Sequence, residues 1–497
     1  MLRRRNGLLG LALLVTYGGG AAAQQTPDTK PVQIPDPPGG QTPPVAPQTV
    51  ETPVPPKVTL PTAPANADVV NRSLTAEEAV RIALRKQPSV AVARAGISAA
   101  QGRTQQVRAG LLPSLGISAG YSSMTVITGG TTGGTTGGTG GGSSTTVSGN
   151  SGSSGSSFGA TGFTGQAVIR QLIFDFNHTR DLVRQSKALT HAAEQNLTRV
   201  QSDLVSQVKQ GYYQVVQADR LVTVDQESLD NRRSQRDLAR ARLNSGLGLP
   251  SDVATAETAY SAGVLTLTLA QNAGAIARVN LAVLMGIDAR TPITTVERGE
   301  PPFPTDDVNS LVDQALKQRP DVLQAQATVD ANRYGVAAAK STNTPVIAGT
   351  LGVTSRGNAF LPGNNSLTIG ATVTFTPFDG GLTQGKVKEA RANLDSAEAQ
   401  LLSARQIVTS DVAQAWLNLR TAEQRVSTAN LEATNATEAV RIATGRYTRG
   451  LGLFQDIITA QGLSVTARTD LVNAQVQVDI SRAALRRAIC TPPPTVR

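Results

Sequence analysis

The sequence contains few of the side chains on which most enzymes and metalloproteins depend. Its 497 residues include 1 Cys, 2 His and 1 Trp, and aromatic residues make up 3%. The lone cysteine, Cys490, excludes an intrachain disulfide. The two histidines, His178 and His191, fall on nearly opposite faces of an expected helix, so they cannot share a metal ion. No hydrolase, metalloprotease, Walker or CxxC spacing is present. We therefore expect no enzyme activity, no cofactor and no metal.

The sequence also lacks a cluster of basic residues in its mature part. It carries 46 Lys and Arg against 36 Asp and Glu, a formal charge of +10, but these residues are mixed along the chain. The low aromatic content leaves few platforms on which bases could stack. We interpret the charges as solvated helix faces and expect no nucleic-acid partner.

No apolar run near the N-terminus is long enough for a membrane anchor, which needs about 20 residues. The chain begins with Arg3-Arg4-Arg5, continues with an apolar run from Leu8 to Val15, and then has small residues up to Ala21-Ala22-Ala23. This order is typical of a secretory signal peptide. We therefore expect export, with residues 1–23 removed near Ala23. No cysteine follows that could carry a lipid anchor.

Two segments have compositions that cannot bury apolar surface. Residues 24–67 contain 13 prolines, and residues 129–157 contain only Gly, Ser and Thr apart from Val147 and Asn150. We expect the first to be a disordered linker and the second a flexible loop.

What the sequence does contain is a long internal repeat. The run GLGLPSD at Gly246–Asp252 returns as GLGLFQD at Gly450–Asp456, 204 residues later. One architectural unit is therefore used twice, which favours a tube or array built by symmetry. We expect repeat 1 at 68–290, an inter-repeat linker at 291–306, repeat 2 at 307–490 and a short tail at 491–497. The offset of 204 also pairs Phe174-Asp175 with Phe378-Asp379, Tyr212 with Trp416, and Arg242 with Arg446.

Each repeat contains one very long expected helix, Asn177–Ser245 and Leu382–Arg449, in which no proline occurs. About 70 residues at ~1.5 Å per residue would span about 100 Å. Seven-residue steps of apolar residues, such as Val208 to Val215, indicate coiled-coil packing. Shorter helices could stack end to end beside the long ones. They are expected at Ser89–Leu112, Asp252–Met285, Asp321–Thr344 and Asp456–Ile489, with amphipathic helices at Thr75–Lys86 and Val308–Gln318 ended by Pro88 and Pro320.

Alternating segments between the helices predict β-hairpins at about 114–174 and about 345–378. The alternation is clearest in Leu367–Phe375, and it suits either a membrane β-barrel or a soluble flap. In a barrel, Arg170 must face a lumen or lie outside the membrane. Four strands cannot close a barrel, so protomers must pool strands. Two copies would give a barrel of eight strands, and three copies a barrel of twelve. A twelve-stranded barrel is wide enough to begin leaving a channel, and this favours a trimer.

Over residues 73–489 the chain resembles the TolC-type outer-membrane efflux protein family, also called outer membrane factors. The resemblance is carried by SLTAEEAVRIALRKQPSV, LLPSL, LIFDF, FTPFDGG and the two GLGL..D turns. It implies a mainly α fold with a membrane β-barrel, in which a homotrimer forms a twelve-stranded barrel in the outer membrane and a helical coiled-coil tunnel in the periplasm. It further implies a passive exit duct for drug efflux or type I secretion. The implied partners are a periplasmic adaptor (membrane fusion) protein, an inner-membrane transporter of the RND, ABC or MFS type, and outer-membrane lipid.

The resemblance also assigns roles to the two turns as periplasmic tips. Gly246 and Gly450 fit positions that follow a helix C-terminus, and Ser251 is expected to cap the next helix. Where the family has a gate arginine and a carboxylate ring, this chain has Gly452 and Thr459. The alternative is that the motifs are only turns. The implied adaptor-docking residues are Gly246, Leu247, Gly248, Leu249, Asp252, Gly450, Leu451, Gly452, Leu453 and Asp456, and the implied gate residues are Asp252, Arg446, Tyr447, Arg449 and Asp456.

Two rival functions remain open from the sequence. An exported coiled-coil spacer of the envelope would have the same helices without transport activity. A helical signalling or adaptor protein fits poorly, because nothing after residue 24 resembles an inner-membrane span.

Overall fold

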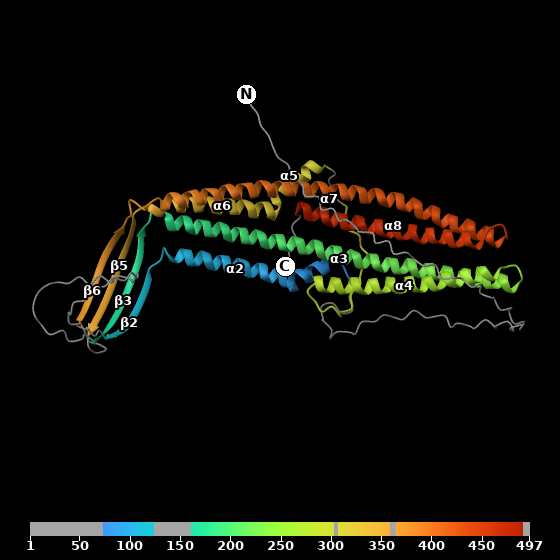
Figure 1. Cartoon of the computed structure of the whole chain (residues 1–497), viewed down its shortest axis with the longest axis horizontal. Coiled ribbons are helices and arrows are strands. Elements are labelled where there is room, and N and C mark those ends of the chain that lie inside the picture. The colour runs from blue at the N-terminus through green and yellow to red at the C-terminus, as the bar shows by residue number, and fades with distance from the viewer. Residues whose placement is uncertain (1–72, 124–160, 303–306, 358–363, 491–497) are drawn as a thin grey trace, which may run out of the picture. The chain divides into compact units, whose positions relative to one another are not determined.

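Two long helices organise the fold, as the sequence predicts. The computed structural model describes residues 73–123, 161–302, 307–357 and 364–490. The expected signal peptide, proline-rich linker, Gly/Ser/Thr loop and C-terminal tail lie outside these residues. Helices α3 (His178–Asn244) and α7 (Leu382–Thr448) each have 67 residues and run in the same general direction through the structure (Figure 1).

Shorter helices accompany the long ones in the same way in both repeats. Along α3, helix α2 (Pro88–Ala109) is followed end to end by α4 (Pro250–Leu284). Along α7, helix α6 (Pro320–Lys340) is followed by α8 (Phe454–Ile489), and both also contact α3. The predicted end-to-end arrangement is therefore confirmed. The remaining elements are α1 (Ala76–Lys86), α5 (Val308–Gln318) and a 3₁₀ turn at Ser341–Asn343.

Prolines and acidic side chains fix where the helices begin. Pro88 and Pro320 each occupy the first turn of a helix, and the preceding Gln87 and Arg319 are extended, with ψ of 123° and 128°. The repeated Phe-Asp motif also has a local role. Its aspartates, Asp175 and Asp379, accept hydrogen bonds of 2.7 and 2.8 Å from the backbone N–H of Thr179 and Thr383, respectively.

The strands form one four-stranded antiparallel sheet in the order β2-β3-β5-β6. Its members are β2 (Ser114–Ser123), β3 (Thr161–Phe174), β5 (Val346–Gly357) and β6 (Asn364–Thr374). Both predicted hairpins are present, and the β3–β5 pairing joins one repeat to the other. Within the described residues, β2 and β6 each pair on one side only, so the sheet has two free edges.

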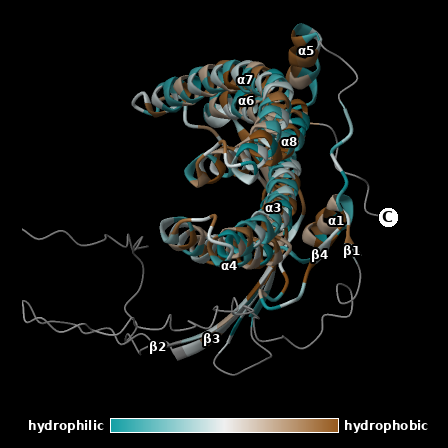
Figure 2. Cartoon of the chain, turned by 90° about the vertical axis from the view of Figure 1, so that its right-hand side faces the viewer, coloured by the Kyte–Doolittle hydropathy of each residue, from teal (hydrophilic) through white to brown (hydrophobic). Residues whose placement is uncertain are grey.

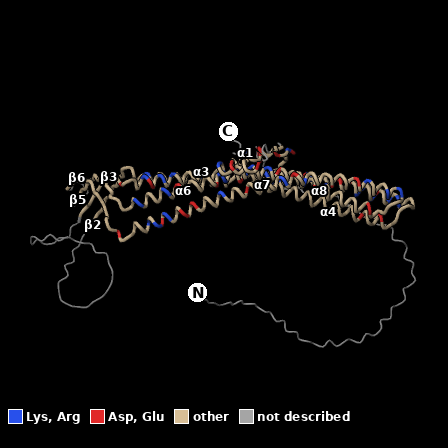
Figure 3. The backbone as a smooth tube through the Cα atoms, turned by 90° about the horizontal axis from the view of Figure 1, so that it is seen from above, with Lys and Arg blue, Asp and Glu red and all other residues tan. Residues whose placement is uncertain are grey.

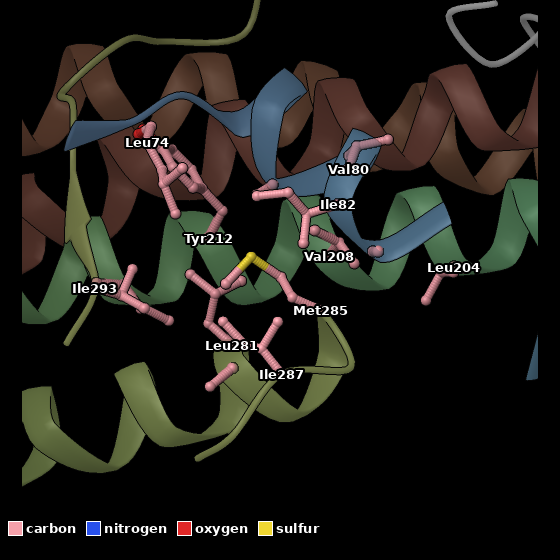
Figure 4. Close-up of a cluster of buried hydrophobic side chains, with 14 of the residues drawn as sticks. Leu74, Val80, Ile82, Leu204, Val208, Tyr212, Leu281, Met285, Ile287 and Ile293 are labelled. Atoms are coloured by element: carbon pink, nitrogen blue, oxygen red, sulfur yellow. The ribbon is translucent and has the colours of Figure 1, made fainter. Parts of the chain in front are cut away.

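The largest core lies midway along the helices, where a small two-stranded element joins the start of repeat 1 to the inter-repeat linker. Strand β1 (Ser73–Leu74) pairs in parallel with β4 (Thr294–Thr295), a contact that the sequence did not predict. Tyr212 of α3 is fully buried there, and its single O–H proton is shared between the Leu74 carbonyl, 3.0 Å from Oη, and the Val296 carbonyl. Leu281, Met285, Val208 and Ile82 pack around this tyrosine (Figure 4).

A second core binds α5 to α7 and α8 and confirms the predicted coiled-coil seam. Val412 and Leu419 of α7 are buried against Leu485 and Ile489 of α8. Helices α1 and α5 and the β1–β4 pair lie on one side of the long helices (Figure 2). Charges of both signs are mixed along the helices (Figure 3).

A buried carboxylate fastens the expected inter-repeat linker to two helices. Glu300 is 4% exposed and accepts hydrogen bonds from Lys209 Nζ at 2.5 Å, from Tyr213 Oη at 2.8 Å and from Arg486. Its own backbone N–H donates to Asp479 of α8 at 2.9 Å. Burial and the Glu300 charge raise the pKa of Tyr213, so the phenol stays a donor. The segment is thus a strap between α3 and α8.

None of the helices in the described ranges combines the length and the apolar character needed to cross a bilayer. In the same ranges, no group of three or more His, Cys, Asp or Glu side chains is placed to hold a metal ion.

Candidate functional site

The two GLGL turns close the helical hairpins α3–α4 and α7–α8 at the end of the unit farthest from the sheet (Figure 1). Gly246 and Gly450 have φ of +73° and +74°. The N–H groups of these glycines donate at 3.0 Å to the carbonyls of Leu243 and Tyr447, respectively. The N–H groups of the next residues, Leu247 and Leu451, donate at 2.9 Å to the carbonyls of Arg242 and Arg446. This pair of bonds is the Schellman motif, which satisfies the last helix carbonyls. The predicted placement of both glycines is confirmed.

The second glycine of each motif is required by close approach. A Cβ on Gly248 would lie 2.8 Å from the backbone nitrogen of Leu243, and one on Gly452 would lie 3.0 Å from Cβ of Arg446. The turn folds back against the last turn of its own helix at these points. A larger side chain at position 452 would require the turn or Arg446 to move.

The expected capping role of Ser251 is wrong. Helix α4 begins at Pro250, with Leu249 as the residue before it and no side-chain cap, so Ser251 already lies in the first turn. Proline is suited to this first position because its φ is preset and it has no N–H to satisfy. In the other tip, Asp456 Oδ2 accepts from the N–H of Leu453 at 3.2 Å. Asp456 thus stabilises the start of its own helix.

The leucines of both tips lie on the surface. Leu247, Leu249, Leu451 and Leu453 are 73%, 62%, 77% and 71% exposed. Exposed apolar side chains gathered at one end of a structure are a common mark of a protein contact surface. They belong to the residues expected to dock an adaptor.

Tyr447 and Asp252, two of the implied gate residues, meet in the structure. Tyr447 Oη donates to Asp252 Oδ2 at 3.1 Å. The Tyr447 ring packs edge-on against Phe454, with centroids 5.3 Å apart, in an apolar cluster that includes Ala239 and Ile457. Burial and the Asp252 carboxylate raise the pKa of Tyr447, so it remains a hydrogen-bond donor at neutral pH. The contact ties hairpin α7–α8 to hairpin α3–α4.

Arg242 reinforces this contact, and sequence reasoning missed it. Its Nη1 donates to the carbonyl oxygens of Tyr447 at 2.7 Å and Thr448 at 3.1 Å, and its Cζ lies 4.6 Å from the centre of the Tyr447 ring. A cation at the C-terminal carbonyls of a helix also complements the helix dipole. The available signal was an arginine in the last turn of α3, but its target on α7 is distant in sequence.

The other expected gate residues do not join this cluster. Arg446 and Arg449 are exposed, and in the described part of the chain no hydrogen bond or ion pair involves either guanidinium. Asp456 is engaged with its own helix start. Thr459 donates to the carbonyl of Gln455 within α8.

The sheet is apolar on one face and polar on the other. In an antiparallel pair, directly opposed residues share a face. One apolar row crosses all four strands through Leu115, Ile169, Leu351 and Ile369, and a second passes through Ile117, Ala167, Val353 and Leu367. The large residues of these rows are 38% to 78% exposed.

The opposite face carries most of the small and polar side chains, together with Val168 and Leu172. Arg170 lies there, opposite Ser114 and Thr350, at the end of the sheet that joins the helices. The predicted alternation is thus confirmed, and the arginine lies on the polar face.

Comparison with known proteins identifies relatives of this chain. A family model described as outer membrane efflux protein matches residues 79–287 and 311–491. The outer membrane efflux protein BepC of Brucella suis is 26% identical over 330 residues, which cover 64% of this chain and 70% of that protein. Outer membrane protein TolC of Escherichia coli is 24% identical over 343 residues, which cover 65% and 68% of the two chains.

A solved structure shares the fold. The outer membrane protein VceC of Vibrio cholerae superposes with a TM-score of 0.70 at 20% identity, covering 83% of this chain and 95% of that one. The fold class predicted from the sequence, long helices with a small sheet, is therefore confirmed, and so is the resemblance to TolC-type proteins.

Proposed function

Because the chain belongs to the outer membrane efflux protein family, we propose that three copies of it form the exit duct of a tripartite export system. The chain is an outer-membrane protein with a periplasmic helical part. After removal of residues 1–23, the pooled sheets would make a twelve-stranded barrel and the helices would continue it as a tunnel. Substrates would pass without chemical change, from an inner-membrane transporter through a periplasmic adaptor into the duct.

The single observation that carries this proposal is the sheet with its two free edges and its exposed apolar face. Strands β2 and β6 leave backbone groups unpaired, and in lipid each unpaired group costs several kcal/mol. Pairing β6 of one copy with β2 of the next would satisfy both edges. The apolar rows would then face lipid, and the face with Arg170 would line the pore.

The tips support the gating half of the proposal. In a trimer the two hairpin turns of each copy would alternate around the periplasmic mouth. The exposed leucines of both turns would then be available to an adaptor. The Tyr447–Asp252 bond and the Arg242 contacts would hold the mouth closed. Adaptor binding would separate the hairpins by competing with these contacts.

Two measurements test the proposal. Purified protein should run as a trimer in native mass spectrometry and should produce discrete conductance steps in planar lipid bilayers. A trimer that never conducts would favour the rival reading, a structural spacer of the envelope. Crosslinking in cells followed by capture of this protein should recover an adaptor and an inner-membrane transporter of the RND, ABC or MFS type, and it would also identify the cargo class.

A further inference from the structure

The Arg242 contact has an equivalent position in the second copy of the internal repeat, so the repeat predicts two contacts of this kind. Shifting by 204 residues maps Arg242 onto Arg446, and it maps the carbonyls of Tyr447 and Thr448 onto those of Leu243 and Asn244. Within a protomer the first contact is formed, since Arg242 of α3 binds the two carbonyls at the end of α7. The second contact, Arg446 of α7 binding the end of α3, is not formed within the protomer.

The second contact, which is not formed within the protomer, has a donor in Arg446 and acceptors in the carbonyls at the end of α3. Arg446 is exposed, and in the described ranges no hydrogen bond or ion pair involves its guanidinium. The end of α3 has the same Schellman geometry as the end of α7, with Gly246 N–H donating to the Leu243 carbonyl at 3.0 Å. That bond does not prevent a further one. The Tyr447 carbonyl accepts both Gly450 N–H at 3.0 Å and the Arg242 guanidinium at 2.7 Å.

We propose that Arg446 completes the pair between copies, by donating to the Leu243 and Asn244 carbonyls of the neighbouring protomer. This inference rests on the proposed trimeric duct, in which α7–α8 of one copy faces α3–α4 of the next. The mouth would then carry six arginine contacts, three within protomers and three between them. Each places a cation at the negative end of a long helix.

The two kinds of contact differ in strength because the repeats differ in sequence. Within a protomer, Arg242 is supported by the Tyr447–Asp252 hydrogen bond and by the Tyr447 ring. Between protomers, Leu243 stands where Tyr447 stands, and Asp456, the counterpart of Asp252, is engaged with Leu453 N–H. The arginine contact between protomers therefore lacks the support that Tyr447 and Asp252 give to Arg242, so the seam between protomers is where the mouth would open first.

Crosslinking tests the geometry. In a Cys490→Ala background, the pair Arg446→Cys with Asn244→Cys and the matched pair Arg242→Cys with Thr448→Cys are treated with a short bifunctional thiol reagent. After denaturation the first pair should give covalent dimers and trimers, and the second should stay monomeric. A first pair that stays monomeric, while native mass spectrometry shows a trimer, overturns the inference but leaves the proposed duct intact. Absence of any wild-type trimer overturns both.

Conductance tests the role without relying on cysteine variants. Removing an exposed charged contact should raise the open probability at least about threefold for Arg446→Ala, and more than for Arg242→Ala, where Tyr447 and Asp252 remain. Arg441→Ala is the control, because Arg441 pairs with Glu438 within α7 at 2.5 Å, and it should conduct like the wild type. Wild-type gating in Arg446→Ala, or a larger effect for Arg242→Ala, would contradict the assignment.

Discussion

Tyr447 Oη donates a 3.1 Å hydrogen bond to Asp252 Oδ2, joining the last turn of α7 to the first turn of α4. A hydrogen bond to a charged acceptor contributes about 1.5–3 kcal/mol when buried and less at a surface. We predict that Tyr447→Phe combined with Asp252→Ala raises single-channel conductance in planar bilayers, because three such bonds would close the mouth of the proposed trimer.

Tyr334→Phe is the matched control for this experiment. It also removes one phenolic hydroxyl, but Tyr334 lies in α6 beside Arg184, far along the helices from the tips. It should leave conductance unchanged. If the double variant conducts no better than Tyr334→Phe, Tyr447 and Asp252 do not gate the mouth.

Much of this fold could be predicted because its determinants are local or periodic. The absence of proline and the seven-residue seam predict α3 and α7 to within a residue or two, and Pro88 and Pro320 mark the start of α2 and α6. The repeated glycines predict both tips, because a positive φ after a helix is a requirement that glycine satisfies without a steric penalty.

The contacts that the sequence did not predict depend on segments that are distant along the chain, whereas the one error at Ser251 is local. Arg242 and Glu300 look like ordinary surface charges in the sequence, and only folding brings them to Tyr447 and Arg486. The two-residue pairing of β1 with β4 is too short to leave a pattern. Ser251 was misassigned because a good capping residue follows Pro250, whose own preference for the first helical position decides the boundary.

Among the carboxylates midway along the helices, Glu300 should lower the stability of the fold most when it is substituted. Glu300→Gln leaves Lys209 and Arg486 near a neutral group in a buried site, and breaking such a pair costs about 3–5 kcal/mol. We expect a lower urea midpoint of unfolding, measured by far-UV circular dichroism. Glu297→Gln, which loses only a partly exposed pair with Arg220, should cost about 0–1 kcal/mol. Equal midpoints for the two variants would refute the strap.

The buried Tyr212 hydroxyl should make stability fall at alkaline pH. Burial raises its pKa from 10.0 to about 12, so the folded state holds this proton more tightly than the unfolded chain. Its stabilisation is therefore complete below pH 10 and is lost as the pH rises toward 12. Tyr212→Phe has no such proton, so its urea midpoint should fall less steeply between pH 10 and 12. Parallel curves for both proteins would show that the phenol does not carry this dependence.

The tip glycines should resist substitution for a reason that ordinary helix glycines do not share. Gly246→Ala places a side chain at φ of +73°, which costs about 1 kcal/mol or more, and should speed amide hydrogen exchange in the tip. Gly462→Ala lies within α8, and in the described residues nothing is within 4 Å of its new Cβ. It should slow exchange in α8 slightly, since alanine favours a helix. Unchanged exchange in the Gly246 variant would count against the strained turn.

Adjacent residues on β6 separate the two faces of the sheet. Leu367 lies on the apolar face, opposite Val353, and Thr368 lies on the other face, opposite Gly352. A lysine on the lipid side of a barrel costs up to about 2–4 kcal/mol near the bilayer centre, whereas one in a lumen is solvated. Leu367→Lys should therefore reduce the trimer recovered from outer-membrane fractions, and Thr368→Lys should assemble normally and lower cation conductance. The reverse order would place the apolar rows inside the pore and would exclude the barrel orientation proposed for this sheet.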